Sequence, residues 1–170
     1  TTRLYKGEQR ITHMGKVACF AQYAVVPETG CIIIPETVPM DRAALIGCSV
    51  TTGVGAVLFT APVQPGSTVA IVGCGGVGVN VIQGAKLVNA TKIIAVDIRE
   101  GSLEFAMKFG ATHSVNAAYE GAVERVKQIT GGLGADYTFE VRGTPDSIEM
   151  AYAMLRKGGT AVVNGIAPKG

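Results

Sequence analysis

The segment 68–97 constrains the fold of this chain more than any other. Two apolar runs, 69–72 and 93–96, flank a stretch with helical periodicity, and an acid, Asp97, follows the second run. The first run leads directly into three glycines with the spacing G-x-G-x-x-G, which are Gly73, Gly75 and Gly78. This order predicts a strand–turn–helix–strand unit that binds a dinucleotide.

Each residue of this motif has a physical reason. Gly73 permits a tight turn, Gly75 lets the backbone approach a pyrophosphate, and Gly78 lets the helix pack on the strand. The helix is predicted to begin near Gly76, where its unpaired N–H groups and its dipole favour a phosphate. Asp97 can accept hydrogen bonds from both ribose hydroxyls. The alternative, a plain turn without a ligand, is weaker because the flanking strands and the acid are all present.

Length and composition limit the classes of protein that this chain can represent. A chain of 170 residues suits one globular domain, and 48% hydrophobic with 16% charged residues excludes a disordered tail. The 15 basic residues are spread along the sequence at a net charge of +2, which argues against nucleic-acid and anionic-membrane partners. The segment 69–82 is too interrupted by glycine to span a membrane, and the polar start is not a secretory signal.

The four cysteines indicate a reducing compartment. They form no C-x-x-C pair and no Cys/His cluster with zinc spacing, so we expect free thiols and a cytoplasmic location. Cys74, inside the glycine turn, is interpreted as a small apolar filler. The other three are Cys19, Cys31 and Cys48.

The remaining periodicity predicts an α/β fold, a Rossmann doubly wound parallel sheet of about five strands with the sixth missing. The region before residue 40 is irregular and β-like, with short strands expected at 20–26 and 31–35. After it, we predict helices at 41–46, 53–59, 76–88, 102–109, 119–130 and 146–155, and further strands at 113–115, 135–141 and 160–164. Because the sequence lacks an initial methionine and ends after the fifth strand, both ends are expected to be cut.

Six segments together carry a family resemblance. They are 20–26, 45–53, 72–78, 94–97, 108–112 and 139–143, and the block that begins Gly47-Cys48 is the most diagnostic. With them the chain resembles, over nearly its whole length, the zinc-containing alcohol dehydrogenases of the medium-chain dehydrogenase/reductase superfamily. The resemblance implies that residues 1–47 are a remnant of the GroES-like catalytic domain with a linker helix. It implies that residues 48–170 are the NAD-binding Rossmann domain, truncated at the C-terminus.

The resemblance implies a metal role for Cys48. In the family, the matching cysteine is the third ligand of the catalytic zinc, and a thiolate suits that metal. The other two ligands lie upstream of this sequence, so Cys48 alone could not hold zinc. Without the resemblance, Cys48 would be interpreted as a buried inert thiol. His13 and Met14 are expected to border the substrate pocket, and His113 is expected to be structural.

The resemblance also implies a set of cofactor contacts. Thr52 and Val77 are expected against the nicotinamide, Val141 beside the bridge between the two bases, and Gly165 and Ile166 near the carboxamide. For Val77 and Val141, core packing is the alternative, and both roles are compatible. The full predicted set is Thr52, Gly73, Gly75, Gly76, Val77, Gly78, Asp97, Ile98, Val141, Gly165 and Ile166.

Three positions depart from the family pattern. Ser102 replaces a lysine that clamps the ribose in many members. Arg142 stands where a small or aliphatic residue is usual, and could reach a phosphate or the substrate or be a plain exposed loop arginine. Arg99 could meet a 2′-phosphate, but the carboxylate of Asp97 repels that group. The sequence therefore predicts NAD(H) rather than NADP(H).

The resulting hypothesis is an NAD-dependent zinc alcohol dehydrogenase. It would transfer hydride between an alcohol/aldehyde pair and the cofactor, and would form a dimer or tetramer when full length. The present chain is expected to bind cofactor without turnover. Two alternatives stay open, a zinc-free quinone reductase-like protein that uses NADPH and a non-catalytic nucleotide-sensing module.

Overall fold

The computed structural model describes residues 4–11, 17, 19, 21–119 and 121–167. The chain forms two compact units, residues 1–39 and residues 40–170. Residues 40–47, which the sequence grouped with the first region, belong to the second unit and begin its first helical run.

The first unit contains one antiparallel hairpin, β1 (Leu4–Lys6) and β2 (Gln9–Ile11), and one 3-10 turn, η2 (Glu28–Gly30). The strands predicted at 20–26 and 31–35 are wrong for the described residues 21–26 and 31–35, which belong to no strand. The physical reason is that an isolated extended segment has no neighbour to satisfy its backbone N–H and C=O groups. Phe20, His13 and Met14 lie outside the described residues.

The second unit begins with a continuous helical run over residues 40–60. It comprises α1 (Met40–Leu45), the π-helical turn η3 (Ile46–Val50), α2 (Thr51–Gly55) and a second π-helical turn, η4 (Ala56–Thr60). The two separate helices predicted here are therefore one continuous helical run, which no proline interrupts.

This helical run packs on helix α3 (Gly76–Leu87). A Cβ atom at Gly53 would lie 2.5 Å from the Cβ of Asn80, so glycine allows the two helices to cross closely. The Asn80 amide also donates a hydrogen bond of 3.1 Å to the Ser49 hydroxyl. Within the described residues, the run 40–60 is the one helix long and apolar enough to cross a membrane. Val57 near its end is fully buried in the core.

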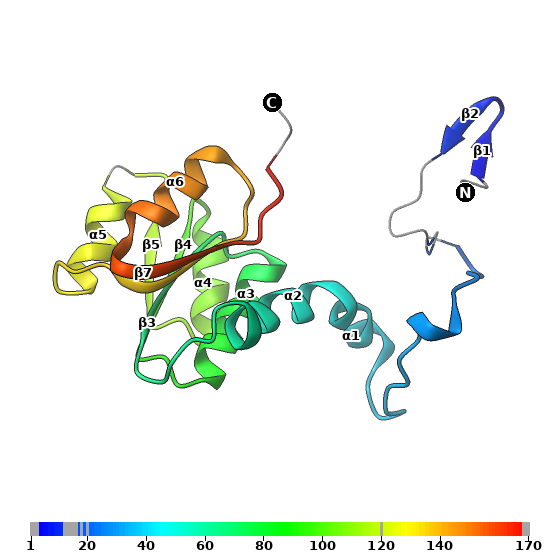
Figure 1. Ribbon diagram of the computed structural model, residues 1–170, viewed down its shortest axis with the longest axis horizontal. Coiled ribbons are helices and arrows are strands. Elements are labelled where there is room, and N and C mark those ends of the chain that lie inside the picture. The colour runs from blue at the N-terminus through cyan, green and yellow to red at the C-terminus, as the bar shows by residue number, and fades with distance from the viewer. Residues whose placement is uncertain (1–3, 12–16, 18, 20, 120, 168–170) are drawn as a thin grey trace. The chain divides into compact units, whose positions relative to one another are not determined.

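Five parallel strands form the sheet of this unit in the order β5-β4-β3-β6-β7 (Figure 1). The chain runs outward from β3 through β4 to β5, then crosses back to place β6 on the other side of β3. This is the doubly wound arrangement predicted from the sequence, with its switch point between β3 and β6. The bounds are β3 (Thr68–Val72), β4 (Lys92–Asp97), β5 (His113–Asn116), β6 (Ala135–Glu140) and β7 (Leu155–Val163).

Helices cover both faces of the sheet (Figure 1). Besides α3 they are α4 (Glu100–Phe109), α5 (Ala122–Ile129) and α6 (Pro145–Ala153). Val69 and Ile71 of β3 pack toward α3 and α4, whereas Ala70 and Val72 pack toward α5 and α6. Alternate residues of a strand face opposite sides, so burial on both sides explains the continuous apolar runs in the sequence.

Candidate functional site

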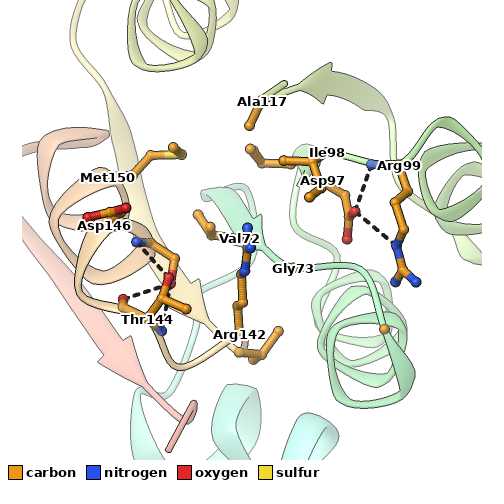
Figure 2. Close-up of a pocket in the computed structure, with 14 residues that line it drawn as sticks. Val72, Gly73, Asp97, Ile98, Arg99, Ala117, Arg142, Thr144, Asp146 and Met150 are labelled. Atoms are coloured by element: carbon orange, nitrogen blue, oxygen red, sulfur yellow. Dashed lines mark hydrogen bonds and ion pairs between the residues drawn. The ribbon is translucent and has the colours of Figure 1, made fainter. Parts of the chain in front are cut away.

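A pocket of about 620 Å³ opens at the carboxyl ends of the parallel strands (Figure 2). Its walls come from the turns after four strands, namely β3, β4, β5 and β6. Gly73 and Gly75 follow β3, Ala117 follows β5 and Val141 follows β6. This is the position at which doubly wound sheets bind ligands, since the chain leaves a crevice where the strand order reverses.

The glycine turn has the steric properties that its sequence predicts. Gly73 has a φ of +99°, a conformation that residues with a side chain rarely adopt. A Cβ atom at Gly78 would lie 2.0 Å from the carbonyl oxygen of Gly73, so only glycine allows α3 to sit this close to the turn. A Cβ at Gly75 would meet no atom within 4 Å, which leaves an open cradle beside the backbone.

Helix α3 begins at this cradle without a side-chain cap. Gly75 is its N-cap residue and has no side chain that could accept a hydrogen bond from the first turn. The N–H groups of the first helical turn, at Gly76, Val77 and Gly78, have no intrahelical acceptor. Together with the helix dipole they form a site suited to a phosphate group.

Asp97, the last residue of β4, is held in place by the backbone around it (Figure 2). One carboxylate oxygen accepts the Cys74 N–H at 2.8 Å, and the other accepts the Arg99 N–H at 2.9 Å. The side chain is buried except for an edge on the pocket. Each carboxylate oxygen has two lone pairs, so both can still accept a hydrogen bond from a ligand hydroxyl.

Arg99 pairs with the same carboxylate. Its Nε lies 3.7 Å from Asp97 Oδ1, and its side chain is largely exposed. An exposed pair of this kind contributes little to stability. The guanidinium nevertheless offsets part of the negative charge that Asp97 presents to the pocket.

Cys74 is a filler in the apolar core, as predicted. Its side chain is buried, and its thiol lies 3.7 Å from the Val96 carbonyl oxygen as a weak donor. Burial, followed by the neighbouring negative charge of Asp97, raises the pKa of Cys74 to about 12. The sulfur is therefore a neutral thiol at physiological pH.

Glu140 shapes the opposite wall of the pocket, and sequence reasoning missed it. This fully buried acid ends β6, and one of its oxygens accepts three hydrogen bonds of 2.7 Å, from the N–H groups of Arg142 and Gly143 and from the Ser147 hydroxyl. Its other oxygen is buried with no hydrogen-bond partner among the described residues. The sequence feature that could have identified Glu140 is an acid at the end of a predicted strand, the same feature that identified Asp97.

The loops after β6 and β7 lie in contact. A Cβ at Gly165 would lie 2.1 Å from the Gly143 nitrogen, and one at Gly143 would lie 2.6 Å from the Ile166 nitrogen. This contact brings the loop that carries Val141 next to Gly165 and Ile166. Val141, which the sequence assigned beside the bridge between the two bases, thus lies on the same side of the site as Gly165 and Ile166, which it assigned to the carboxamide.

The predicted cofactor residues divide into two groups. Five of them line the pocket of Figure 2: Gly73, Gly75, Asp97, Ile98 and Val141. Val77 packs against the core, as does part of Val141, and Thr52 is half-buried in α2. The other six, which lie outside the lining of that pocket, are Thr52, Gly76, Val77, Gly78, Gly165 and Ile166.

A second, mostly apolar hollow of about 940 Å³ adjoins the glycine turn. It lies between the helical run 40–60, α3 and α4, and its lining includes Leu45, Val50 and Phe105. Gly75 and Arg99 line both hollows, so the two meet at the uncapped start of α3.

Cys48 lies on η3 and is exposed, so its interpretation as a buried thiol is wrong. Among the described residues there is no group of three His, Cys, Asp or Glu side chains that could hold a metal ion. A zinc ion with one protein ligand is not a stable site, because structural sites use four ligands and catalytic sites use three. The described residues therefore do not fit a complete zinc site.

Comparison with known proteins identifies the family. The model of the zinc-binding dehydrogenase family matches residues 76–170. The chain is 43% identical over 178 residues to S-(hydroxymethyl)glutathione dehydrogenase of Saccharomyces cerevisiae, with 100% of this chain and 46% of that protein covered. It is 39% identical to alcohol dehydrogenase class-3 of Dictyostelium discoideum, with the same coverage of 100% and 46%.

Solved structures agree with the family match. An alcohol dehydrogenase zinc-binding domain protein from Burkholderia ambifaria superimposes with a TM-score of 0.85 at 38% identity, over 90% of this chain and 41% of that one. Benzyl alcohol dehydrogenase from Acinetobacter calcoaceticus gives a TM-score of 0.84 at 35% identity, over 89% and 41%.

These matches define the class of protein as a zinc-type alcohol dehydrogenase domain with a doubly wound sheet. The chain belongs to the zinc-binding dehydrogenase family. It spans about half the length of the curated relatives that it matches, 46% in the two cases above.

Proposed function

We propose that this chain is the NAD(H)-binding part of an NAD-dependent zinc alcohol dehydrogenase. The observation that carries the proposal is the position of the Asp97 carboxylate. It is fixed by two backbone N–H groups at the rim of the pocket, next to the open glycine turn and the uncapped start of α3. A dinucleotide needs these features together, since its pyrophosphate is an anion and its ribose presents two hydroxyl donors.

Different residues bind different parts of the cofactor. The pyrophosphate binds at Gly75 and the first turn of α3, and the adjacent ribose donates to Asp97. The nicotinamide lies toward Val141, Gly165 and Ile166, with Thr52 and Val77 on the side of the helical run. When bound, NAD(H) supplies the hydride chemistry. The protein orients the cofactor and excludes water from it.

The electrostatics of the pocket favour NAD(H) over NADP(H). A 2′-phosphate on the ribose would lie against the Asp97 carboxylate, and two like charges at that distance repel each other. Arg99 reduces this repulsion but is already paired with Asp97 at 3.7 Å. We therefore expect a clear preference for NADH rather than an absolute exclusion of NADPH.

The zinc and substrate roles belong to the longer protein. There we propose Cys48 as one ligand of the catalytic zinc, while the present chain binds cofactor but does not turn over. The substrate is an alcohol/aldehyde pair, and the relatives do not narrow it because their names specify different alcohols. We further propose a cytoplasmic homo-oligomer without nucleic-acid or membrane partners.

The test is a fluorescence titration of the chain with NADH and NADPH. We expect NADH to bind roughly tenfold more tightly than NADPH, and Asp97→Asn to abolish that preference. Asp146→Asn, which alters another acid in the lining of the same pocket, is the matched control and should leave the preference intact. Circular dichroism of each variant checks that the fold is retained.

Other results of this titration would favour one of the two alternative functions. A preference for NADPH in the unaltered chain would favour the quinone reductase-like protein. Saturable binding of a nucleotide other than these two would favour the sensing module. No saturable binding of either cofactor would contradict the proposed function.

A further inference from the structure

Glu140 makes hydrogen bonds to both of the loops that lie in contact beside the pocket. The side chain binds the loop after β6, since Oε1 accepts the N–H groups of Arg142 and Gly143, each at 2.7 Å. The main chain binds the loop after β7, since the Glu140 carbonyl oxygen accepts the N–H groups of Asn164 at 2.8 Å and Gly165 at 3.2 Å. A single residue therefore provides the acceptors for four N–H groups, two from each loop.

The contact between the two loops leaves no room for a side chain. A Cβ atom at Gly165 would lie 2.1 Å from the Gly143 nitrogen and 2.5 Å from Glu140 Oε2. A Cβ atom at Gly143, whose φ is +83°, would lie 2.6 Å from the nitrogen of Ile166. The position of Gly143 consequently determines where the second loop lies, and the Glu140 side chain holds Gly143.

The first residue of the loop after β6 is held independently of the Glu140 side chain. The Val141 N–H donates to the Val72 carbonyl oxygen at 3.0 Å, which continues the pairing of β6 with β3. The Val141 side chain would also approach a Cβ atom at Gly73 to 3.3 Å, so it lies against the glycine turn. A change of the Glu140 carboxylate therefore leaves this end of the loop in place and releases the end at Gly143.

The environment of the carboxylate suits it to hold a loop in one conformation. Glu140 has no exposed surface, and its Oε2 atom has no hydrogen-bond partner among the described residues. Burial of such an oxygen destabilises a fold, because the hydrogen bonds of water are lost without replacement. In return, a carboxylate at the end of a strand with neighbours on both sides is an acceptor of fixed location.

We infer that Glu140 is a positioning residue, whose carboxylate holds the loop after β7 at the spacing that the nicotinamide half of the dinucleotide requires. This inference rests on the proposed function, in which Gly165 and Ile166 lie toward the nicotinamide. It goes beyond that function by naming a residue that acts through others, since Glu140 does not belong to the lining of the pocket. Its effect should fall on the nicotinamide half of the ligand, because other hydrogen bonds hold the glycine turn.

The test compares two ligands by calorimetric titration of the whole chain. NADH has both halves of the dinucleotide, whereas ADP-ribose lacks the nicotinamide. Glu140→Gln keeps the size of the side chain and one acceptor oxygen, but its neutral oxygen holds the two loop N–H groups less strongly. We expect this variant to bind NADH roughly fivefold more weakly and ADP-ribose less than about twofold more weakly. A general loss of stability would not produce such a difference.

Thr138→Val is the matched control. Thr138 is also fully buried and stands two residues earlier on β6, and its hydroxyl has no hydrogen-bond partner among the described residues. The substitution should leave the ratio of the two affinities unchanged. Glu140→Asp, which keeps the charge but draws the oxygens back by one methylene group, should shift the ratio in the same direction as Glu140→Gln. Circular dichroism checks that each variant is folded.

Three results would overturn the inference. Glu140→Gln could bind NADH as tightly as the unaltered chain does, or it could weaken the binding of both ligands by the same factor. Thr138→Val could shift the ratio as far as Glu140→Gln does, which would show that any change in this strand disturbs the site. Failure of the proposed function is a distinguishable outcome, because the unaltered chain would then bind neither NADH nor ADP-ribose.

Discussion

The two units contain similar apolar side chains. Only the second unit, residues 40–170, buries them among the described residues. In residues 40–170, Phe139 and Ile71 lie in a core between the sheet and its helices, with 0% exposure. In residues 1–39, Val25 and Ile33 are each 98% exposed, and no described residue of that unit is buried.

The difference teaches that an apolar pattern becomes a strand only where a neighbour pairs with it. The strand 69–72 lies between β4 and β6, which satisfy its backbone groups on both edges. The segments 21–26 and 31–35 have equally good strand-forming composition but no pairing partner among the described residues. Strand propensity is therefore a statement about packing and pairing more than about the local backbone.

The largest effect should come from the core of the second unit. Phe139→Ala removes a fully buried ring of β6 from the core cluster that contains residues of β3, α3 and α4, and leaves a cavity there. We expect a loss of about 3–5 kcal/mol in the free energy of unfolding, measured by urea denaturation. A loss below about 1 kcal/mol would mean that this core is loosely packed.

Next in size is the loss of the buried acid that organises the pocket wall. Glu140→Ala leaves the N–H groups of Arg142 and Gly143 without their acceptor, whereas the Ser147 hydroxyl keeps the Thr144 carbonyl oxygen at 2.9 Å. We expect about 2–4 kcal/mol of destabilisation by thermal or urea unfolding. Glu140→Gln, which keeps one acceptor oxygen, should cost clearly less. Equal losses in the two variants would contradict the role given to the hydrogen bonds.

Thiol reactivity should distinguish the buried core from the exposed segments without a mutation. Cys19 and Cys31 of the first unit and Cys48 of the second are exposed, whereas Cys74 is buried. At about pH 8, a disulfide reagent should label the exposed thiols at least roughly a hundredfold faster than Cys74. Rapid labelling of all four would show that the glycine turn opens readily.

The pH dependence of Cys74 has a definite sign. Its pKa is raised to about 12, well above the ordinary thiol value of 9.0, chiefly because the thiol is buried. Its contribution to stability is therefore complete below about pH 9 and is lost as the pH rises toward 12, because only the unfolded chain releases the proton. Cys74→Ser should flatten this alkaline decline in unfolding experiments, and an unchanged decline would assign it to other groups.

The smallest effect should come from the exposed apolar residues of the first unit. Ile33→Ser replaces a side chain that is 98% exposed among the described residues, so the free energy of unfolding should change by less than about 0.5 kcal/mol. The measurement is the same urea denaturation as for Phe139→Ala. A loss greater than about 1 kcal/mol would show that Ile33 is covered in solution.

The sequence predicted those parts of the site that depend on local geometry. Gly73 and Gly78 are needed for a turn within one strand–helix unit, and Asp97 ends the next strand, so spacing alone located them. Glu140 was missed because its partners lie in a loop and a helix whose arrangement only the folded chain reveals. The contact between Gly143 and Gly165 likewise depends on the pairing of β6 with β7.

The continuity of the helical run 40–60 was missed for a related reason. Gly47, Gly53 and Gly55 weaken a helix when it is judged by propensity alone. In the folded chain, Gly53 instead allows close packing on α3, so tertiary contact outweighs the local cost.

The central claim is that residues 40–170 hold a dinucleotide at the glycine turn. The most direct test is amide chemical-shift mapping of the isotope-labelled chain by NMR during titration with NADH. We predict saturable shifts at residues 73–78, 97–99 and 141–143, and none at residues 21–39. Shifts that saturate elsewhere while the amides of 73–78 stay unchanged, or no saturable shift at all, would contradict the account.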